Sequence, residues 1–125
     1  DRVVRTAGDI TTTSTTLVDV TGASVTFTTG AFPVAYSAII TRKNSVADEM
    51  FFNVAVDGAL ELGSSGMRMA NHSVGDPRQA TVSGLTAALT AASHTIKLQW
   101  KVSSGTGTIF AGSAAAHMFS AHEVR

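Results

Sequence analysis

The 125-residue sequence contains no cysteine, and only 14% of its residues are charged. Without cysteine the chain cannot form a disulfide framework, a thiolate zinc site or a thiol nucleophile. Nine basic residues balance nine acidic ones, and no run of lysine or arginine forms a basic segment that could bind phosphate backbones or anionic lipid. We therefore expect no nucleic-acid partner.

Long apolar runs are also lacking. No stretch approaches the ~20 apolar residues that a bilayer-spanning helix requires, and no charged-then-apolar segment opens the chain. We therefore expect no membrane insertion. The chain begins with aspartate rather than methionine, which leaves open that it is a fragment of a longer protein.

The sequence does contain enough apolar residues for a core, together with many small polar ones. Hydrophobic residues make up 44% of the chain, while the charged fraction lies well below the ~25% of ordinary soluble domains. A weakly charged surface with a net charge of zero favours association. The composition therefore favours one domain that forms an oligomer.

Hydrophobic residues mostly recur with a period of two, which is typical of strands. The sequence predicts two short strands, Val18–Val20 and Val25–Phe27, separated by a Thr-Gly pair. A further strand over 35–43 is apolar on both faces for most of its length. We expect it to be central and covered on both sides until Arg42 and Lys43 reach solvent.

Two segments predict hairpins. The Asp57-Gly58 pair supplies the positive φ angles of a tight type I′ turn after the alternating strand FFNVAV. In SHTIKLQWKVSSGTGTIFAG, apolar and polar residues alternate, so Trp100 should be buried; residues 103–107 then reverse the chain and 108–111 return. Strands rather than helices are also expected through Val82 and through Phe119.

Roughly eight or nine strands exceed the mean of ~5–6 for one sheet, so two packed sheets are expected. The predicted fold class is all-β: an antiparallel β-sandwich, jelly-roll-like, that occupies residues 16–125 as a single domain. Residues 1–15 are predicted to form an extended N-terminal lead-in arm that lies along a neighbour or leads in from another segment. Their threonines suit an extended backbone but build little core.

The sequence contains no motif for catalysis or for a cofactor. SSGTGT lacks the lysine and the following helix of a phosphate-binding loop, and no G-x-S-x-G elbow occurs. His117 and His122, five residues apart in a strand, face opposite sides and cannot share a zinc ion, so we expect exposed or interface histidines. We predict no enzyme, no cofactor and no metal site, and leave calcium binding by Asp48, Glu49 and Asp76 open as an alternative.

Candidate binding residues lie in the glycine-rich segment 63–79, which is predicted to be a long surface connection or an irregular edge. Such loops often carry binding sites. For a glycan, the aromatic residues that could stack on a sugar are Tyr36 and Trp100, although the alternation places Trp100 inward. The candidate binding residues of the segment are Met67, Arg68, Asn71, His72, Asp76 and Arg78.

Three segments together resemble small β-sandwich proteins of tailed-bacteriophage virions: DITTTSTTLVDVTGASVTFTTG, FFNVAVDG and GLTAALTAASHTIKLQWKVSSGTGTIFA. In such proteins a threonine-rich first strand, a strand ending in V-D-G and an H-T-I-K-L-Q-W strand before a Gly-Thr turn recur as a set. The resemblance implies a jelly-roll domain, often trimeric and similar in architecture to tumour-necrosis-factor-like trimers. The resemblance further implies that such a domain is used in tail fibres, tail-tip knobs or capsid decoration, and it implies no enzyme.

Two functions of different class remain open. The first is a structural virion protein, exposed on the particle as a decoration, fibre or tail-tip component, whose partners are further copies, preferably in a trimer, and other virion proteins. The alternative is a head domain that binds a host-surface glycan or receptor for host attachment. The scarcity of aromatic residues favours the first. Both imply a protein that is assembled in the host cytoplasm and exposed on the extracellular virion.

Overall fold

The computed structural model describes residues 1–70, 74–112 and 116–125. In these ranges the chain forms strands, and it contains no helix long and apolar enough to cross a membrane. The strands are β1 (Arg2–Arg5), β2 (Ile10–Thr12), β3 (Val18–Thr28), β4 (Val34–Asn44), β5 (Met50–Val56), β6 (Ala59–Leu60), β7 (Met67–Met69), β8 (Arg78–Leu85), β9 (Ser93–Val102), β10 (Gly107–Ile109) and β11 (His117–Glu123).

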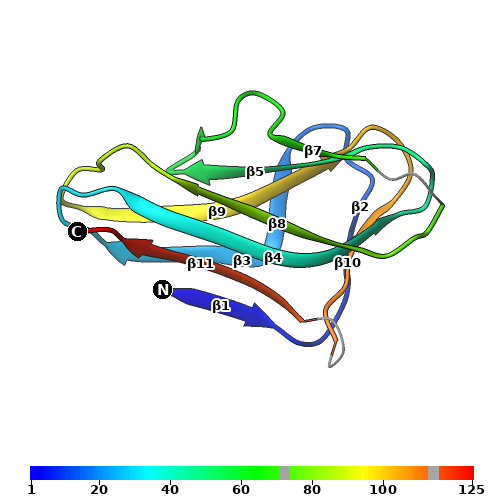
Figure 1. Cartoon of the computed structure of the whole chain (residues 1–125), viewed down its shortest axis with the longest axis horizontal. Helices are drawn as coiled ribbons and strands as arrows, with labels where there is room; N and C mark the ends of the chain where they lie inside the picture. Colours follow the sequence, from blue (N-terminus) through cyan, green and yellow to red (C-terminus); the bar gives the residue numbers. More distant parts are fainter. Residues whose placement is uncertain (71–73, 113–115) are drawn as a thin grey trace.

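The strands form two antiparallel sheets that pack face to face (Figure 1). Sheet A has the order β1-β11-β4-β8. In the same sheet, β10 pairs with the C-terminal end of β4, and β2 pairs with β10. Sheet B has the order β3-β9-β5, with β6 and β7 both paired to β5. Most successive strands alternate between the sheets, as in a double-sheet jelly roll. The predicted fold class, an all-β antiparallel sandwich of jelly-roll type, is confirmed.

The core lies between the sheets and is built by alternation along each strand. In β9 the inward side chains of Ile96, Leu98, Trp100 and Val102 are each at most 1% exposed. The Trp100 ring stacks on Phe52 of β5, with 6.1 Å between ring centroids and 29° between planes. The predicted burial of Trp100 is confirmed.

The predicted Asp57-Gly58 hairpin is present. Asp57 has a φ of 49° and Gly58 a φ of 88°, the two positive values that a type I′ turn requires. Strands β5 and β6 pair on either side of the turn, with Val56 opposite Ala59. Strands β8 and β11 also occupy the segments predicted for them.

The segment after Trp100 does not form the predicted second hairpin. Strand β9 lies in sheet B, whereas β10 pairs with β4 and β2 in sheet A. The end of β4 holds the connection: Asn44 Nδ2 donates to the Ser104 carbonyl at 3.1 Å, and the Thr106 N–H donates to Ser45 Oγ at 2.8 Å. The glycines of this segment indicate a reversal of the chain but not which sheet receives the next strand.

Two predictions about individual strands are wrong. The segment predicted to form two short strands is the single strand β3, whose register shifts between Asp19 and Ser24, where Gly22 has a φ of 79°. Strand β4 is central as predicted, but the described residues cover only one of its faces. Arg42 is 5% exposed and Ile39 is 44% exposed, because the alternation turns Arg42 inward and Ile39 outward.

Residues 1–15 form one edge of sheet A. Strand β1 pairs with β11 and β2 with β10, so the backbone of this segment is hydrogen-bonded within the chain. Ile10 is buried, and the Asp9 carboxylate accepts the Ala111 N–H at 2.9 Å. The sequence predicts an arm that lies along a neighbour or leads in from another segment. In the structure its strands β1 and β2 lie along the chain's own C-terminal half.

Candidate functional site

The outer face of sheet B carries a compact group of charged and amide side chains. Along β9 the buried residues alternate with Thr95, Lys97, Gln99 and Lys101, which therefore point away from the core. The strand register places Asp19 of β3 opposite Gln99. Polar groups from two neighbouring strands thus meet at the centre of this face.

A depression of about 380 Å³ lies on this face, between β3, β9 and the β5–β6 turn. This volume falls in the range of ~300–1,000 Å³ that is typical of small-molecule sites. Ala55 and Gly58 form its apolar lining. Its polar lining consists of Asp19, Asp57, Thr95, Lys97 and Gln99.

Asp19 is fixed by the two side chains that face it from β9. Its Oδ2 accepts a hydrogen bond from Lys97 Nζ at 2.8 Å, and its Oδ1 accepts one from Gln99 Nε2 at 2.8 Å. The hydrogen bonds from Gln99 and Lys97 lower the pKa of Asp19. The carboxylate is therefore ionised and oriented on a strand rather than on a loop.

Asp57, the second carboxylate of the depression, is held by the start of β9. Its Oδ1 accepts the Thr95 N–H at 2.8 Å, and its Oδ2 lies 2.6 Å from Nδ1 of His94. The other ring nitrogen of His94, Nε2, lies 2.9 Å from the Thr90 carbonyl oxygen. Because a carboxylate and a carbonyl only accept, both contacts are satisfied when both ring nitrogens carry a proton.

These contacts shift two pKa values in opposite directions. The hydrogen bonds from the Thr95 N–H and from His94 lower the pKa of Asp57, while those to Asp57 and to the Thr90 carbonyl raise the pKa of His94. The sequence offers no acid near His94, since Asp57 lies 37 residues away. The V-D-G turn could have revealed the pair, because an antiparallel pairing of β5 with β9 sets the turn beside the start of β9.

The outer face of sheet A is different in composition. Val4, Met118, Ile39 and Thr81 lie directly opposite one another across β1, β11, β4 and β8. The next row across β11, β4 and β8 consists of Ser120, Ser37 and Ser83, and the row beyond it of His122, Ala35 and Leu85. The charged side chains that these four strands place on this face are Arg2 and Lys43, and both lie at its margins.

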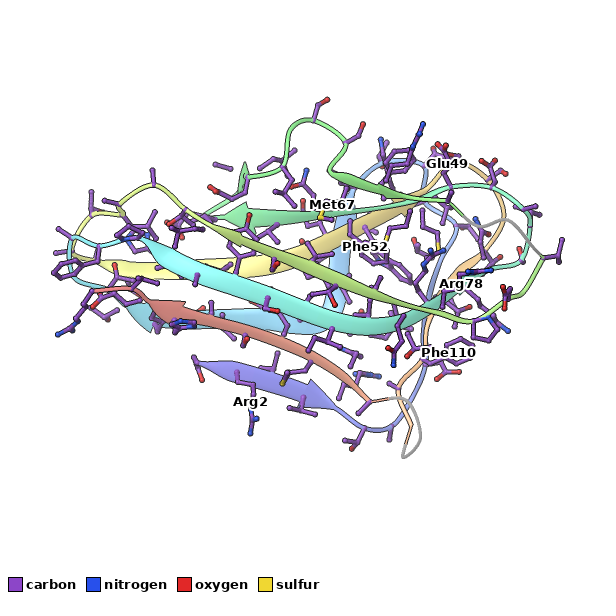
Figure 2. All side chains as sticks on the ribbon, in the orientation of Figure 1. Arg2, Glu49, Phe52, Met67, Arg78 and Phe110 are labelled. Atoms are coloured by element: carbon purple, nitrogen blue, oxygen red, sulfur yellow. The ribbon has the colours of Figure 1, made fainter. Side chains whose placement is uncertain are left out.

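Three of the described candidate residues of the 63–79 segment take part in two separate ion pairs. Arg68 Nη1 lies 3.2 Å from Glu49 Oε1, and Arg78 Nη2 lies 2.8 Å from Asp76 Oδ2. Met67 and Arg78 lie well apart in Figure 2, which also shows Arg78 toward the end of the sandwich that carries Glu49. Two of the candidates lie outside the described residues, namely Asn71 and His72.

Neither aromatic residue considered for stacking on a sugar is at the surface. Tyr36 is 4% exposed and Trp100 is 1% exposed, and both belong to the core. The depression on sheet B contains neither ring.

The prediction that the histidines are exposed or lie at an interface is wrong for His117. It is 1% exposed on the inward side of β11, and both its ring nitrogens lack a hydrogen-bond partner among the described residues. Burial and the nearby charge of Arg5 lower its pKa. His122 is exposed on the opposite side of the strand, as its spacing predicts.

The acids considered as calcium ligands have separate partners. Asp48 Oδ2 accepts a hydrogen bond from Ser104 Oγ at 2.6 Å, while Glu49 and Asp76 each pair with an arginine. In the part of the chain that the structure describes, no three histidine, aspartate or glutamate side chains converge as metal ligands.

No protein-family model and no curated protein matches the chain. Among solved structures, the insecticidal δ-endotoxin Cry8Ea1 of Bacillus thuringiensis is similar with a TM-score of 0.52 and 15% identity, over 92% of this chain and 20% of that one. The C-terminal domain of EclA, a sugar-binding protein, gives 0.49 and 11% over 92% of this chain and 77% of that one. Infectious bursal disease virus, Gx strain, gives 0.48 and 11% over 98% of this chain and 32% of that one. These likenesses concern the fold alone.

Proposed function

We propose that the chain is a non-enzymatic structural protein of a tailed-bacteriophage virion, exposed on the particle and acting through interfaces between its own copies, with a trimer as the expected assembly. The outer face of sheet A carries this proposal. The resemblance of three sequence segments to sandwich proteins of such virions supports it. A decoration, fibre or tail-tip position is compatible with such a face.

The outer face of sheet A has the composition of a surface that is covered in an assembly. Val4, Ile39 and Leu85 are exposed by 49%, 44% and 58%, and serine and threonine side chains surround them. Contact with another copy would remove this apolar surface from water without burying an ion pair. Small and β-branched side chains also lose little rotamer entropy on burial.

Light scattering and sedimentation of the purified chain test the assembly. We expect a trimer at micromolar concentration and dissociation in Ile39→Lys, because a lysine at the centre of this face would have to bury its charge. Thr28→Lys, which adds the same charge at an exposed position of β3 in the other sheet, is the matched control and should leave the trimer intact. A wild-type monomer, or equal dissociation in both variants, contradicts the proposal.

A second function, host attachment through a surface glycan, is favoured by one specific observation. The depression on sheet B combines carboxylate, ammonium and amide groups in a volume suited to a small polar ligand. Binding of the purified chain to host cells or to immobilised host polysaccharide tests this function, and a chain that binds neither contradicts it.

A further inference from the structure

The depression on the outer face of sheet B lies on the opposite side of the sandwich from the face proposed for assembly. We propose that it binds a neutral sugar unit through neighbouring hydroxyl groups, which hydrogen-bond to Asp19, Lys97 and Gln99. This inference rests on the second proposed function, host attachment. It places the binding site on three strands and a turn, outside the 67–78 segment.

Each charged group that lines the depression has a partner within the chain, and the partner of Asp57, His94, lies outside the lining. Lys97 faces Asp19 at 2.8 Å, and His94 faces Asp57 at 2.6 Å. An anionic ligand would meet two carboxylates, and a cationic ligand would meet the ammonium group of Lys97. A neutral ligand leaves both ion pairs in place, and no charged group loses its partner. The arrangement therefore favours a neutral ligand over an anion or a cation.

The polar groups keep hydrogen-bonding capacity beyond their contacts with the described chain. The Lys97 ammonium has three N–H donors and gives one to Asp19. Each oxygen of Asp19 accepts one hydrogen bond, from Lys97 or from Gln99, and has a further lone pair. A sugar hydroxyl both accepts and donates, so it can accept from Lys97 while it donates to Asp19.

The network is in place before a ligand arrives, and this lowers the entropic cost of binding. Asp19 is held by two hydrogen bonds of 2.8 Å to side chains of β9, a strand at the centre of sheet B. The apolar lining is limited to Ala55 and Gly58, with no aromatic ring among the described lining residues. We therefore expect weak binding by each site, with a dissociation constant on the order of 1 mM. Several copies in an oligomer would raise the avidity.

An NMR titration of the full chain, followed by its backbone amide shifts, tests the proposal. The probes are the methyl glycosides of glucose, galactose, mannose and N-acetylglucosamine, with phosphate as the anionic probe and glycine as the zwitterionic one. We expect saturable shifts at residues 19, 95, 97 and 99 with at least one glycoside. Lys97→Met should weaken that binding by about tenfold or more, the loss expected for a hydrogen bond to a charged group.

Lys101→Met is the matched control. Lys101 lies on the same strand and the same face as Lys97 but outside the lining of the depression, and its Nζ donates to Ser65 Oγ at 3.2 Å. Its replacement should leave the affinity for the glycoside unchanged. Unchanged amide spectra of both variants away from the substitution show that each remains folded.

Each other outcome overturns a defined part of the proposal. Saturable shifts confined to 67–70 and 74–78 would overturn the depression as the site and leave host attachment standing. Stronger binding of phosphate or glycine than of every glycoside would overturn the class of ligand. Equal losses in Lys97→Met and Lys101→Met would overturn the assigned residues. If no glycoside binds at millimolar concentration although the chain attaches to host cells, the sugar inference fails alone; if attachment also fails, the second proposed function fails with it.

Discussion

The two outer faces of this sandwich are built by the same alternation of side chains, yet they differ in chemistry. On sheet B the outward residues of β9 are polar or charged, and the two acids beside them are paired with Lys97 and His94. On sheet A the centre of the face consists of serine, threonine and aliphatic residues, among them the exposed Ile39. The fold requires only the inner face of each sheet to be apolar, so the composition of the outer faces can differ. Here the outer face of sheet B is suited to contact with water, and the outer face of sheet A is suited to burial.

Charged side chains are distributed differently on the two sheets. Charges on sheet B are arranged in pairs around a depression, where water or a polar ligand can solvate them. A face without central charges can be covered by another copy at a much lower desolvation cost. The low charge content of the sequence, 14%, is therefore not spread evenly over the molecule.

The largest expected effect comes from the core that both faces share. Trp100→Ala should lower the free energy of unfolding by about 3–5 kcal/mol, because the indole is 1% exposed and stacks on Phe52. Gln99→Ala, at the neighbouring outward position, should lower stability by about 1 kcal/mol or less, since its partly buried side chain loses one exposed hydrogen bond, to Asp19. Urea unfolding of both variants checks the alternation. Similar losses in the two would show that β9 does not divide core from surface.

A smaller effect is expected at the edge of sheet A. Removal of residues 1–13 deletes β1 and β2, their ladders to β11 and β10, and the buried Ile10. Each ladder hydrogen bond contributes about 1 kcal/mol net, and the freed chain regains entropy, so we expect a loss of about 2 kcal/mol. Urea unfolding of the truncated chain measures it. Unfolding identical to that of the full chain would mean that this segment is an arm rather than part of the sheet.

Local patterns were sufficient to predict much of this fold. The alternation through Trp100 and the Asp57-Gly58 turn both depend on neighbouring residues, so the sequence predicts them correctly. The path after β9 could not be predicted in the same way. A glycine-rich reversal is compatible with return in the same sheet or in the other one, and here the side chains of Asn44 and Ser45, far earlier in the chain, hold it in sheet A.

The candidate site was less accessible to sequence analysis than the fold. Asp19 and Lys97 come from strands 78 residues apart, and neither belongs to a motif. Their meeting depends on the β3–β9 register, which shifts beside Asp19. The glycine-rich composition of the 63–79 segment indicates only that this connection is irregular, and it does not indicate that its side chains converge.

On the side of sheet A, the buried His117 makes stability depend on pH. Its pKa in the folded chain is below the ordinary histidine value of about 6.5, so the unfolded chain binds the proton more tightly. The contribution of the neutral His117 ring to stability is complete above the ordinary histidine pKa. It is lost as the pH falls toward the lower pKa of the folded chain. His117→Leu removes two buried nitrogens without partners among the described residues and should raise stability near pH 5 by about 1 kcal/mol relative to wild type.

Urea unfolding between pH 5 and pH 7.5, run on His117→Leu and wild type together, measures this loss. His122→Gln, at an exposed position of the same strand, is the control and should keep the acid dependence of wild type. If His117→Leu keeps the same slope with pH as wild type, the acid sensitivity comes from another group.

The raised pKa of His94 predicts a pH dependence of the opposite sign on the side of sheet B. Its pKa is raised by Asp57 and the Thr90 carbonyl, so its contribution to stability is complete below the ordinary histidine pKa and is lost as the pH rises through the raised value. Asp57→Asn should return the pKa of His94 toward its ordinary value while keeping the turn, because asparagine tolerates the positive φ of this position. A ring titration of His94 by NMR measures the shift directly.

Asp19→Asn is the control. It removes the other carboxylate of the same depression without touching His94, and it should leave the titration of His94 unchanged. A pKa of His94 that is unchanged in Asp57→Asn, or lowered equally in both variants, would mean that the general field of the face and not the Asp57 contact holds the proton. The specific pairing of acids with Lys97 and His94 would then not be what distinguishes the outer face of sheet B from that of sheet A.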